Sequence, residues 1–414
     1  MATTRPTRRP DLEIHLGTSG QVVGRLHLGS GRRSAFSYDE GWLRDARFFT
    51  LSPELLPVAG VQHPRHVFFL ALEDSAPDAW GERVIRRAHA KLRQEGRDTP
   101  ALAPVDFVMW VDDEARIGAL RLFDPQAGTY VCAGGANRHV PPLVELDKVL
   151  RATRALEEGT ESERDLRYLL GQGTSLGGAR PKSTVRDTDG RLAVGKFPSQ
   201  ADRRDVIRGE VLAMQLAGKA GIRVASARVE MIGGTAVAII RRFDRSDDGG
   251  RIPYVSAATM LQSDGRDATH AYTELVDVLL QSGADPIVDI HELWRRLVFN
   301  FVICNTDDHL RNTGFLYDAR LRGWRLSPAF DLNPMPGDRR ESKTWLTEDS
   351  GVIDSRGMLM SAARYFRLDE TQAKAIWSEV TQAVEGWRAV ARGLGMRGTD
   401  LVDFEPAFIE PITS

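Results

Sequence analysis

Two aspartates and an asparagine in the second half of the chain have the types and the spacing needed to transfer a phosphoryl group. Asp307 precedes Asn312 by five positions in the run NTDDHLRN, and Asp331 ends the later run SPAFD. One short loop with this spacing can present a carboxylate to an attacking hydroxyl and an amide oxygen to Mg²⁺. Asp331 stands where a second metal carboxylate is expected. The pattern predicts a metal-dependent phosphoryl-transfer site.

Two features upstream suit the binding of nucleotide phosphates. Segment 171–182 has four glycines among twelve residues, so its backbone N–H groups could surround a phosphate, although it lacks the ending of a Walker A loop. Lys196 stands in the apolar run LAVGKF, and Glu210 is expected on the next helix. Protein kinases hold a phosphate-binding lysine with a helix glutamate in this order along the chain. The order of these parts therefore favours a kinase.

Each feature also has a purely structural interpretation. The glycine cluster can be a flexible turn, Lys196 can be an edge-strand lysine with its head in water, and Asp307 can belong to a loop-capping cluster. A transition-metal site is disfavoured, because the other eight histidines are scattered singly. His309 is therefore interpreted as an orienting or packing residue rather than a metal ligand.

Composition narrows the class of protein. The 414 residues are 42% hydrophobic and 27% charged, as in an ordinary globular protein of two or three domains. The two cysteines, Cys132 and Cys304, exclude a Cys-rich zinc site and, without a signal-like segment, indicate a reducing compartment. The net charge of -2 gives no global attraction to nucleic acid or membrane, and no run approaches the roughly 18 apolar residues of a spanning helix. We expect a cytoplasmic protein with no membrane partner.

Hydrophobic periodicity predicts the elements that must position these residues in an α/β chain. Alternation predicts short strands over 12–38, and a four-residue repeat predicts a helix that starts at Asp78. Gly233 and Gly234 predict a two-residue hairpin turn. The other expected elements are strands over 183–186, 192–197, 223–232, 235–241, 314–317 and 324–326, and helices over 143–156, 162–170, 272–280 and 291–303, with a further helix carrying Glu210.

Composition shifts predict four parts. Residues 1–123 form a β-rich module with a helix, and 124–142, rich in Gly, Asn, Pro and Ala, form a connection. Residues 143–255 form a nucleotide-binding part, and 256–414 form a mainly helical catalytic part.

The motifs together resemble those of the HipA-type serine/threonine kinases of bacterial toxin–antitoxin systems. The run SLGGARPK (175–182) is similar to the family's Ser-x-x-Gly-Ala-x-x-Lys loop, and TDDHLRN (306–312) to its Thr-Asp-x-His-x-x-Asn catalytic loop. The run LSPAFD (326–331) resembles its metal motif, and RFDR (242–245) the segment after the hinge. FSYDEGW (36–42) resembles its N-terminal module. The resemblance implies a bilobal, kinase-like α/β fold with a small β-rich N-terminal module and a helical C-terminal lobe.

The resemblance also implies a role for each motif residue. Asp307 would be the catalytic base, Asn312 and Asp331 the Mg²⁺ ligands, and Ser175 the site whose autophosphorylation ejects the glycine loop and silences the kinase. Residues implied to bind ATP are Gly177, Gly178, Ala179, Lys182, Lys196, Arg241, Phe243, His309, Asn312 and Asp331, with Arg241 and Phe243 offering backbone groups to adenine. The pair Arg180-Pro181 departs from the family's more polar pair and is expected to stiffen the loop.

The function implied by the resemblance is that of an ATP- and Mg²⁺-dependent protein serine/threonine kinase and toxin. Its implied partners are a HipB-like helix-turn-helix antitoxin, operator DNA through that antitoxin, and a protein substrate, for which a translation component is one candidate. Two alternatives stay open: a catalytically silent scaffold or co-repressor that binds antitoxin and DNA, and an enzyme that phosphorylates a small molecule or transfers AMP. The intact Asp307, Asn312, Asp331 and Lys196 argue against the silent scaffold.

Overall fold

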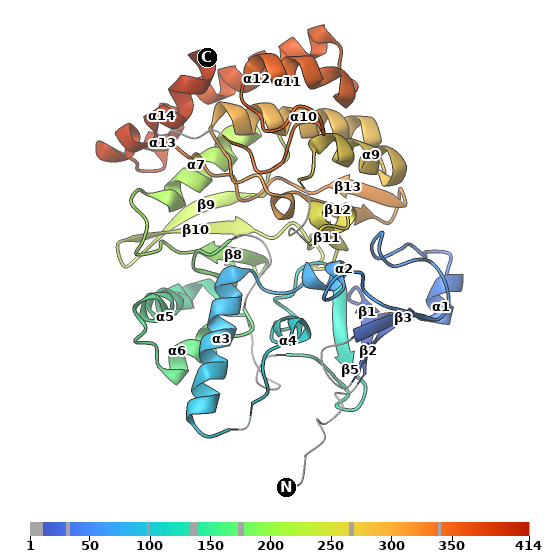
Figure 1. The fold of residues 1–414 in the computed structure, drawn as a ribbon. Helices are drawn as coiled ribbons and strands as arrows, with labels where there is room; N and C mark the ends of the chain where they lie inside the picture. Colours follow the sequence, from blue (N-terminus) through green and yellow to red (C-terminus); the bar gives the residue numbers. More distant parts are fainter. Residues whose placement is uncertain are drawn as a thin grey trace. The chain divides into compact units, whose positions relative to one another are not determined.

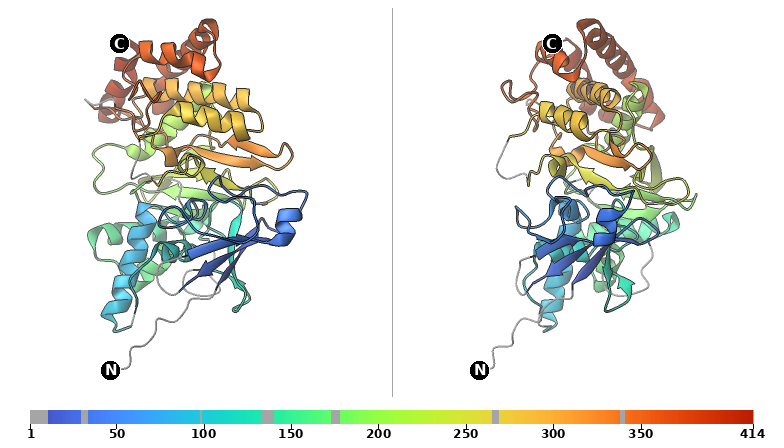
Figure 2. Two further views of the ribbon diagram at one scale, coloured as in Figure 1. Left: turned by 45° about the vertical axis from the view of Figure 1, so that its right-hand side comes forward. Right: turned by 90° about the vertical axis from the view of Figure 1, so that its right-hand side faces the viewer.

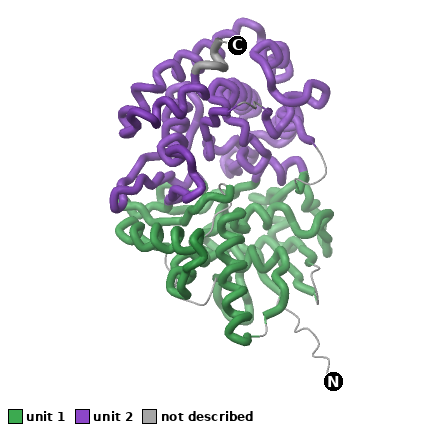
Figure 3. Tube along the Cα trace, turned by 60° about the vertical axis from the view of Figure 1, so that its left-hand side comes forward, with its two compact units in different colours: residues 1–192, 244–255, 262–264 green, residues 193–243, 256–261, 265–414 purple. Residues whose placement is uncertain are grey.

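The computed structural model describes residues 11–29, 34–97, 99–132, 140–172, 178–264, 269–337 and 341–413. The chain forms two compact units, coloured green and purple in Figure 3. The first comprises Met1–Leu192, Asp244–Val255 and Gln262–Asp264, and the second comprises Ala193–Phe243, Ser256–Leu261 and Gly265–Ser414. Each unit is therefore built from segments that are distant in the sequence. The four-part division expected from composition stays a prediction.

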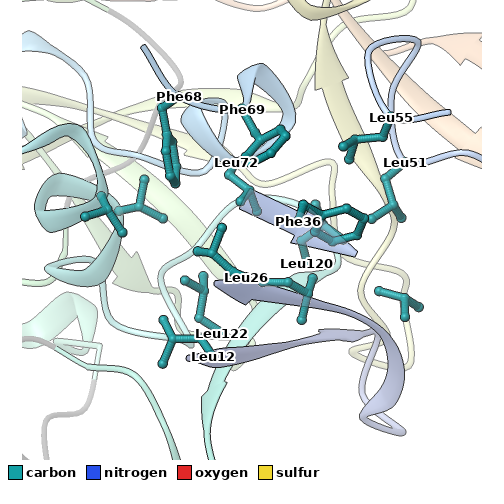
Figure 4. Close-up of a cluster of buried hydrophobic side chains, with 14 of the residues drawn as sticks. Leu12, Leu26, Phe36, Leu51, Leu55, Phe68, Phe69, Leu72, Leu120 and Leu122 are labelled. Carbon is teal, nitrogen blue, oxygen red and sulfur yellow. The ribbon is translucent and has the colours of Figure 1, made fainter. Parts of the chain in front are cut away.

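The first unit is built on a six-stranded antiparallel sheet with the order β4-β3-β2-β1-β5-β6 (Figure 1). Its strands are β1 (Leu12–Leu16), β2 (Gln21–Leu28), β3 (Ser34–Tyr38), β4 (Val61–Gln62), β5 (Leu120–Asp124) and β6 (Thr129–Tyr130). Apolar side chains from β1, β2, β3 and β5 pack with Phe69 and Leu72 in one buried cluster (Figure 4). The strands expected over 12–38 are confirmed, because their alternating residues have a core to cover.

The remaining elements of the first unit are mainly helices. They are α1 (Glu40–Arg44), α2 (Leu70–Glu73), α3 (Ala79–Gln94), α4 (Pro104–Met109), the 3-10 turn η1 (Leu143–Glu145), α5 (Leu146–Glu158), α6 (Glu163–Leu169) and strand β7 (Lys182–Arg186). Helix α3 begins where the sequence predicts, because the Asp78 carboxylate accepts a hydrogen bond of 3.0 Å from the N–H of Gly81. Its four-residue repeat buries Trp80, Val84 and Ala88.

Three antiparallel strands and one helix open the second unit. Strands β8 (Leu192–Lys196), β10 (Thr235–Arg241) and β9 (Ala227–Ile232) pair in this order, and α7 (Val206–Lys219) packs against β9 and β10. Gly233 and Gly234 join β9 to β10 with φ angles of 54° and 81°. Both angles lie in the left-handed region that glycine adopts without strain, so the expected hairpin turn is confirmed.

Helices make up most of the rest of the second unit. They are α8 (Ala257–Met260), α9 (Tyr272–Ser282), α10 (Pro286–Val302), α11 (Arg356–Ala362), α12 (Glu370–Glu385), α13 (Trp387–Gly393) and α14 (Thr399–Thr413), with 3-10 turns η2 (Leu310–Asn312) and η3 (Ala363–Phe366). Strand β11 (Tyr254–Ser256), whose first two residues belong to the first unit, leads into α8, and β12 (Gly314–Asp318) pairs with β13 (Gly323–Leu326). In Figure 2, helices α9 and α10 (gold) lie between the β12–β13 hairpin and α12. None of the described helices has both the length and the apolar character needed to cross a bilayer.

We predict that Gly24→Ala lowers the free energy of unfolding by about 1–3 kcal/mol, because β2 leaves no room for a methyl group. An added Cβ would lie 2.7 Å from the carbonyl oxygen of Ser37 and closer still to the ring of Phe36. Urea unfolding of the two proteins measures the difference. Gly357→Ala is the matched control, since a Cβ there meets no atom within 4 Å. Equal stability of the Gly24 and Gly357 variants would contradict the packing described for β2.

Candidate active site

A buried ammonium group forms the centre of the candidate site. The Nζ atom of Lys196 lies 2.5 Å from Oε1 of Glu210 and 2.7 Å from Oδ1 of Asp331. All three side chains are buried. The expected pairing of Lys196 with a glutamate of the next helix is therefore present, and the alternative of an edge-strand lysine with its head in water is wrong.

Strand β8 and helix α7 place the two upstream members of this cluster. Lys196 is the last residue of β8 and stands opposite Ala238 of β10, and Glu210 lies on the buried face of α7. Burial by itself lowers the pKa of Lys196, but the charges of Asp331 and Glu210 outweigh burial and raise it. The ammonium is therefore charged at neutral pH.

Asp331 reaches the cluster from a strained stretch of backbone. Its φ of 54° lies in the left-handed region, which costs a non-glycine residue about 1–2 kcal/mol and which aspartate tolerates better than most. Neighbouring contacts hold it there. The N–H of Ala329 donates to the carbonyl of Arg223 at 2.7 Å, and the amide of Asn333 donates to the carbonyl of Asp331 at 3.2 Å.

The loop between α10 and β12 carries the other predicted residues. The side-chain amide of Asn312 donates to the main-chain carbonyl of Asp307 at 2.7 Å, and the N–H of Asn312 donates to the carbonyl of His309 at 2.8 Å. The amide NH₂ of Asn312 thus fixes the loop that carries Asp307. The carboxylate of Asp307 forms an ion pair with Lys343 through Oδ1.

Burial and the charges of Asp307 and Asp331, which lie on two different loops, affect the pKa of His309. Burial lowers the pKa of this imidazole, and the positive charge of Lys343 lowers it further. The negative charges of Asp307 and Asp331 act in the opposite direction but do not cancel the effect of burial. Nε2 of His309 is 3.9 Å from Oδ1 of Asp307. A neutral histidine at this position suits the interpretation as an orienting residue.

Asp308 has a different environment from its neighbour Asp307. Its carboxylate is buried and accepts hydrogen bonds from the hydroxyl of Tyr272, at 2.8 Å, and from the N–H of Lys343, at 2.5 Å. The hydroxyl of Thr344 donates to its carbonyl at 2.7 Å. Burial raises the pKa of Asp308 to about 6, although these donors oppose the shift. Asp308 therefore holds the loop in place, and Asp307, one residue away, is left to face the solvent.

The described part of the glycine loop belongs to the first unit. Gly178, Ala179 and Lys182 are described, whereas Ser175 and Gly177 lie outside the described residues. The ammonium of Lys182 is buried, pairs with Asp78 and donates to the carbonyl of Gly178 at 2.7 Å. Lys182 thus ties the end of the loop to the start of α3. Its contact with ATP stays a prediction.

Arg241 and Phe243 lie at the end of β10 and just beyond it. The N–H of Arg241 donates to the carbonyl of Ser226 at 2.8 Å, which limits the contact expected with adenine to other backbone groups. The ring of Phe243 packs against that of Phe330, with centroids 5.4 Å apart. Because Phe330 precedes Asp331, the side chain of Phe243 packs next to the segment that carries Asp331.

The donor atoms offered by Asn312 and Asp331 are an amide oxygen and a carboxylate oxygen, the hard ligands that Mg²⁺ prefers. Among the residues that the structure describes, no cluster of three or more His, Cys, Asp or Glu side chains is arranged to hold a metal. Mg²⁺ commonly binds through one or two protein ligands together with the phosphates of a nucleotide. The residues present therefore fit a metal that enters with a nucleotide better than a resident metal.

Two residues of this site were missed in the sequence. Lys343, which pairs with Asp307, lies in a charged stretch outside every motif. Tyr272, which donates to Asp308, lies 36 positions before that aspartate. No motif or spacing connects either residue to the catalytic loop. Local pattern could place Tyr272 at the start of a helix, which is confirmed, but not its hydroxyl beside Asp308.

Comparisons with known proteins agree with these motifs. The sequence-family model of the HipA-like C-terminal domain matches residues 174–387, and that of the HipA N-terminal domain matches residues 12–102. The chain belongs to the HipA family. The family resemblance inferred from the motifs is confirmed.

A curated relative and a solved structure extend this finding along the whole chain. The protein named "Putative kinase Y4mE" of Sinorhizobium fredii is 24% identical over 440 residues, which cover 94% of this chain and 89% of that protein. A chain of the Shewanella oneidensis toxin–antitoxin complex of HipA, HipB and operator DNA matches with a TM-score of 0.69 at 15% identity. That match covers 97% of this chain and 96% of the other. The mixed α/β, kinase-like fold expected from the sequence, with its β-rich N-terminal part and helical C-terminal part, is that of HipA and is confirmed.

We predict that Asp308 makes the protein less stable as the pH rises from 4 to 7. The folded carboxyl, with a pKa of about 6, binds a proton that the unfolded carboxyl, with a pKa of about 4, has released, so the free energy of unfolding falls across this range. The free energy of unfolding of wild type minus that of Asp308→Asn should therefore fall by up to about 3 kcal/mol between pH 4 and pH 7.

Urea unfolding at several pH values tests this prediction. Asp349→Asn is the matched control, because the side chain of Asp349 is exposed and its replacement should leave the difference independent of pH. A difference between wild type and Asp308→Asn that stays constant, or that grows with pH, would contradict a raised pKa for the Asp308 carboxyl.

Proposed function

We propose that this HipA-family protein is an ATP- and Mg²⁺-dependent protein serine/threonine kinase that acts as the toxin of a toxin–antitoxin pair. The observation that carries the proposal is the buried Lys196 between Glu210 and Asp331, in the same unit as the Asp307 loop. A buried ammonium with two carboxylates on separate elements suits a phosphate-binding lysine held by a helix glutamate, with a metal-binding aspartate beside it. Family membership supports the same conclusion.

Each side chain of the site then has a distinct task. Asp307 orients the hydroxyl of the substrate and accepts its proton, since its carboxylate is partly exposed. Lys196 binds phosphate oxygens, and Glu210 keeps the ammonium in place. Asn312 holds the main chain of Asp307 through its NH₂ group, and its amide oxygen is the atom to offer to Mg²⁺ together with Asp331. When bound, Mg²⁺-ATP supplies the phosphoryl group that is transferred.

Two further parts of the proposal concern regulation and partners. Phosphorylation of Ser175 would add about -1.5 to -2 charges to a loop that is expected to hold the phosphates of ATP, which favours an open, inactive loop. The structural match to a HipA–HipB–operator complex supports a HipB-like antitoxin as partner, with operator DNA contacted through it. The choice of target protein depends on surface shape rather than on the catalytic residues.

We predict that Asp307→Asn abolishes phosphoryl transfer and leaves the fold and ATP affinity unchanged. The amide has the shape of the carboxylate but cannot accept the hydroxyl proton. Incubation with Mg²⁺ and γ-labelled ATP should label the wild-type protein, and mass spectrometry should find the phosphate on Ser175. The variant should carry no label, and induction of the variant in cells should not inhibit growth.

The same measurements separate the proposal from its alternatives. A wild-type protein that binds antitoxin but never consumes ATP would be a silent scaffold. Transfer of AMP, or label on a small molecule alone, would mean another reaction on this fold. If Asp307→Asn still transfers the γ-phosphate, another residue is the base.

We predict that Mg²⁺ strengthens ATP binding at least about tenfold, or about 1.4 kcal/mol, and that EDTA or Asp331→Ala removes this gain. Isothermal titration calorimetry measures the affinity with and without the metal. Asp349→Ala, in an exposed stretch of the same unit, is the matched control. ATP affinity that is insensitive to both EDTA and Asp331→Ala would remove Asp331 from the proposed metal site.

A further inference from the structure

Lys343 contacts the proposed catalytic carboxylate although no motif includes it. Its ammonium pairs with Oδ1 of Asp307, and its side chain is 56% exposed. Asp307 itself is 33% exposed. An ion pair this exposed contributes only about 0–1 kcal/mol to stability, so stability alone gives no reason to place a lysine there.

The backbone of Lys343 is fixed much more firmly than its side chain. The N–H of Lys343 and the hydroxyl of Tyr272 both donate to the buried carboxylate of Asp308, and the hydroxyl of the next residue, Thr344, donates to the carbonyl of Asp308. We call these three hydrogen bonds the Asp308 clasp. Asp308, Thr344 and Tyr272 are all buried. The Asp308 clasp therefore joins segment 342–344 to the catalytic loop with bonds that are costly to break.

A second set of bonds gives segment 342–344 its shape. The hydroxyl of Ser342 donates to the carbonyl of Thr344 at 2.9 Å and accepts from the N–H of Ile353 at 3.0 Å. The Cα of Lys343 therefore has little freedom. Only the side-chain rotamers of Lys343 then remain to be ordered when the ion pair forms.

We propose that Lys343 is the positioning residue for Asp307 in the phosphoryl-transfer reaction. This inference rests on the proposed function of the site. The ammonium holds Oδ1, so that the carboxylate keeps one orientation and presents Oδ2 to the substrate hydroxyl. The Asp308 clasp makes this possible, because it fixes both Asp307 and Lys343 relative to the same buried carboxylate. Geometry errors of about 1 Å at a reacting group can cost about 100-fold in rate, so this contact matters to rate rather than to stability.

The kinetic test compares wild type with Lys343→Met and Lys343→Arg. The phosphate acceptor is a copy of this chain that carries Asp307→Asn, and label transferred from γ-labelled ATP gives the initial rate. We expect Lys343→Met to lower the rate at saturating ATP by about 10- to 100-fold and to change the KM for ATP less than about twofold. Lys343→Arg, which keeps the charge, should recover part of the loss.

The matched control is Lys374→Met. Lys374 also forms an exposed ion pair, with Glu370 on α12, and is 61% exposed. Its replacement should leave the rate unchanged. All variants should unfold at the same urea concentration as wild type, which excludes a loss of fold as the cause of a slower reaction.

Two kinetic outcomes would overturn the inference and leave the proposed function intact. If Lys343→Met is as fast as wild type, or faster, the lysine does not assist Asp307, and a faster variant would make it an inhibitory cap. A higher KM for ATP at an unchanged maximal rate would make Lys343 a nucleotide-binding residue.

A structural readout decides the inference even if wild type proves inactive and the proposed function fails. Crystal structures of the full chain should show one rotamer of Asp307 in wild type and in Lys374→Met, and two or more in Lys343→Met. A single, unchanged rotamer of Asp307 in Lys343→Met would show that Lys343 does not position it.

Discussion

Three elements of the second unit converge on a buried positive charge, the ammonium of Lys196. It binds carboxylates from a helix and from a distant loop, so β8, α7 and the segment that ends at Asp331 must all arrive at one point. Removing the ammonium from such a cluster would leave two carboxylates uncompensated in a medium of low dielectric constant, which costs several kcal/mol. The cluster therefore constrains the three elements together, and the same charge is what a phosphate would recognise.

The two loops beside this cluster hold their functional groups by similar means. Asn312 and Asp308 use their side chains to fix backbone, and the backbone in turn orients Asp307. Asp331 keeps a left-handed backbone because hydrogen bonds at Ala329 hold the residues before it. Adjacent aspartates thus take different roles: Asp308 is buried among donors and binds a proton easily, while Asp307 remains partly exposed beside an ammonium group.

Two lysines show that a motif gives a residue type but not its contacts. Lys182 ends the glycine-rich motif, and sequence alone assigns it to ATP, yet its ammonium is buried against Asp78. Lys343 belongs to no motif, and the fold brings it to Asp307. A lysine side chain is long and flexible, so its position in the sequence fixes where its Cα lies and leaves several places for its charged end.

The sequence by itself determined the family, the kinase-like fold class, the hairpin at Gly233 and the helix that starts at Asp78. These features depend on local spacing, helix caps and hydrophobic periodicity, and each of these signals is contained within a short stretch of sequence. Only the tertiary structure decided which charges meet, because the pairs span distances along the chain that no local pattern encodes. Lys196 and Asp331 are separated by 135 positions, and Asp307 and Lys343 by 36. Such contacts exist only after the packing of β8, α7 and the helical part has brought the elements together.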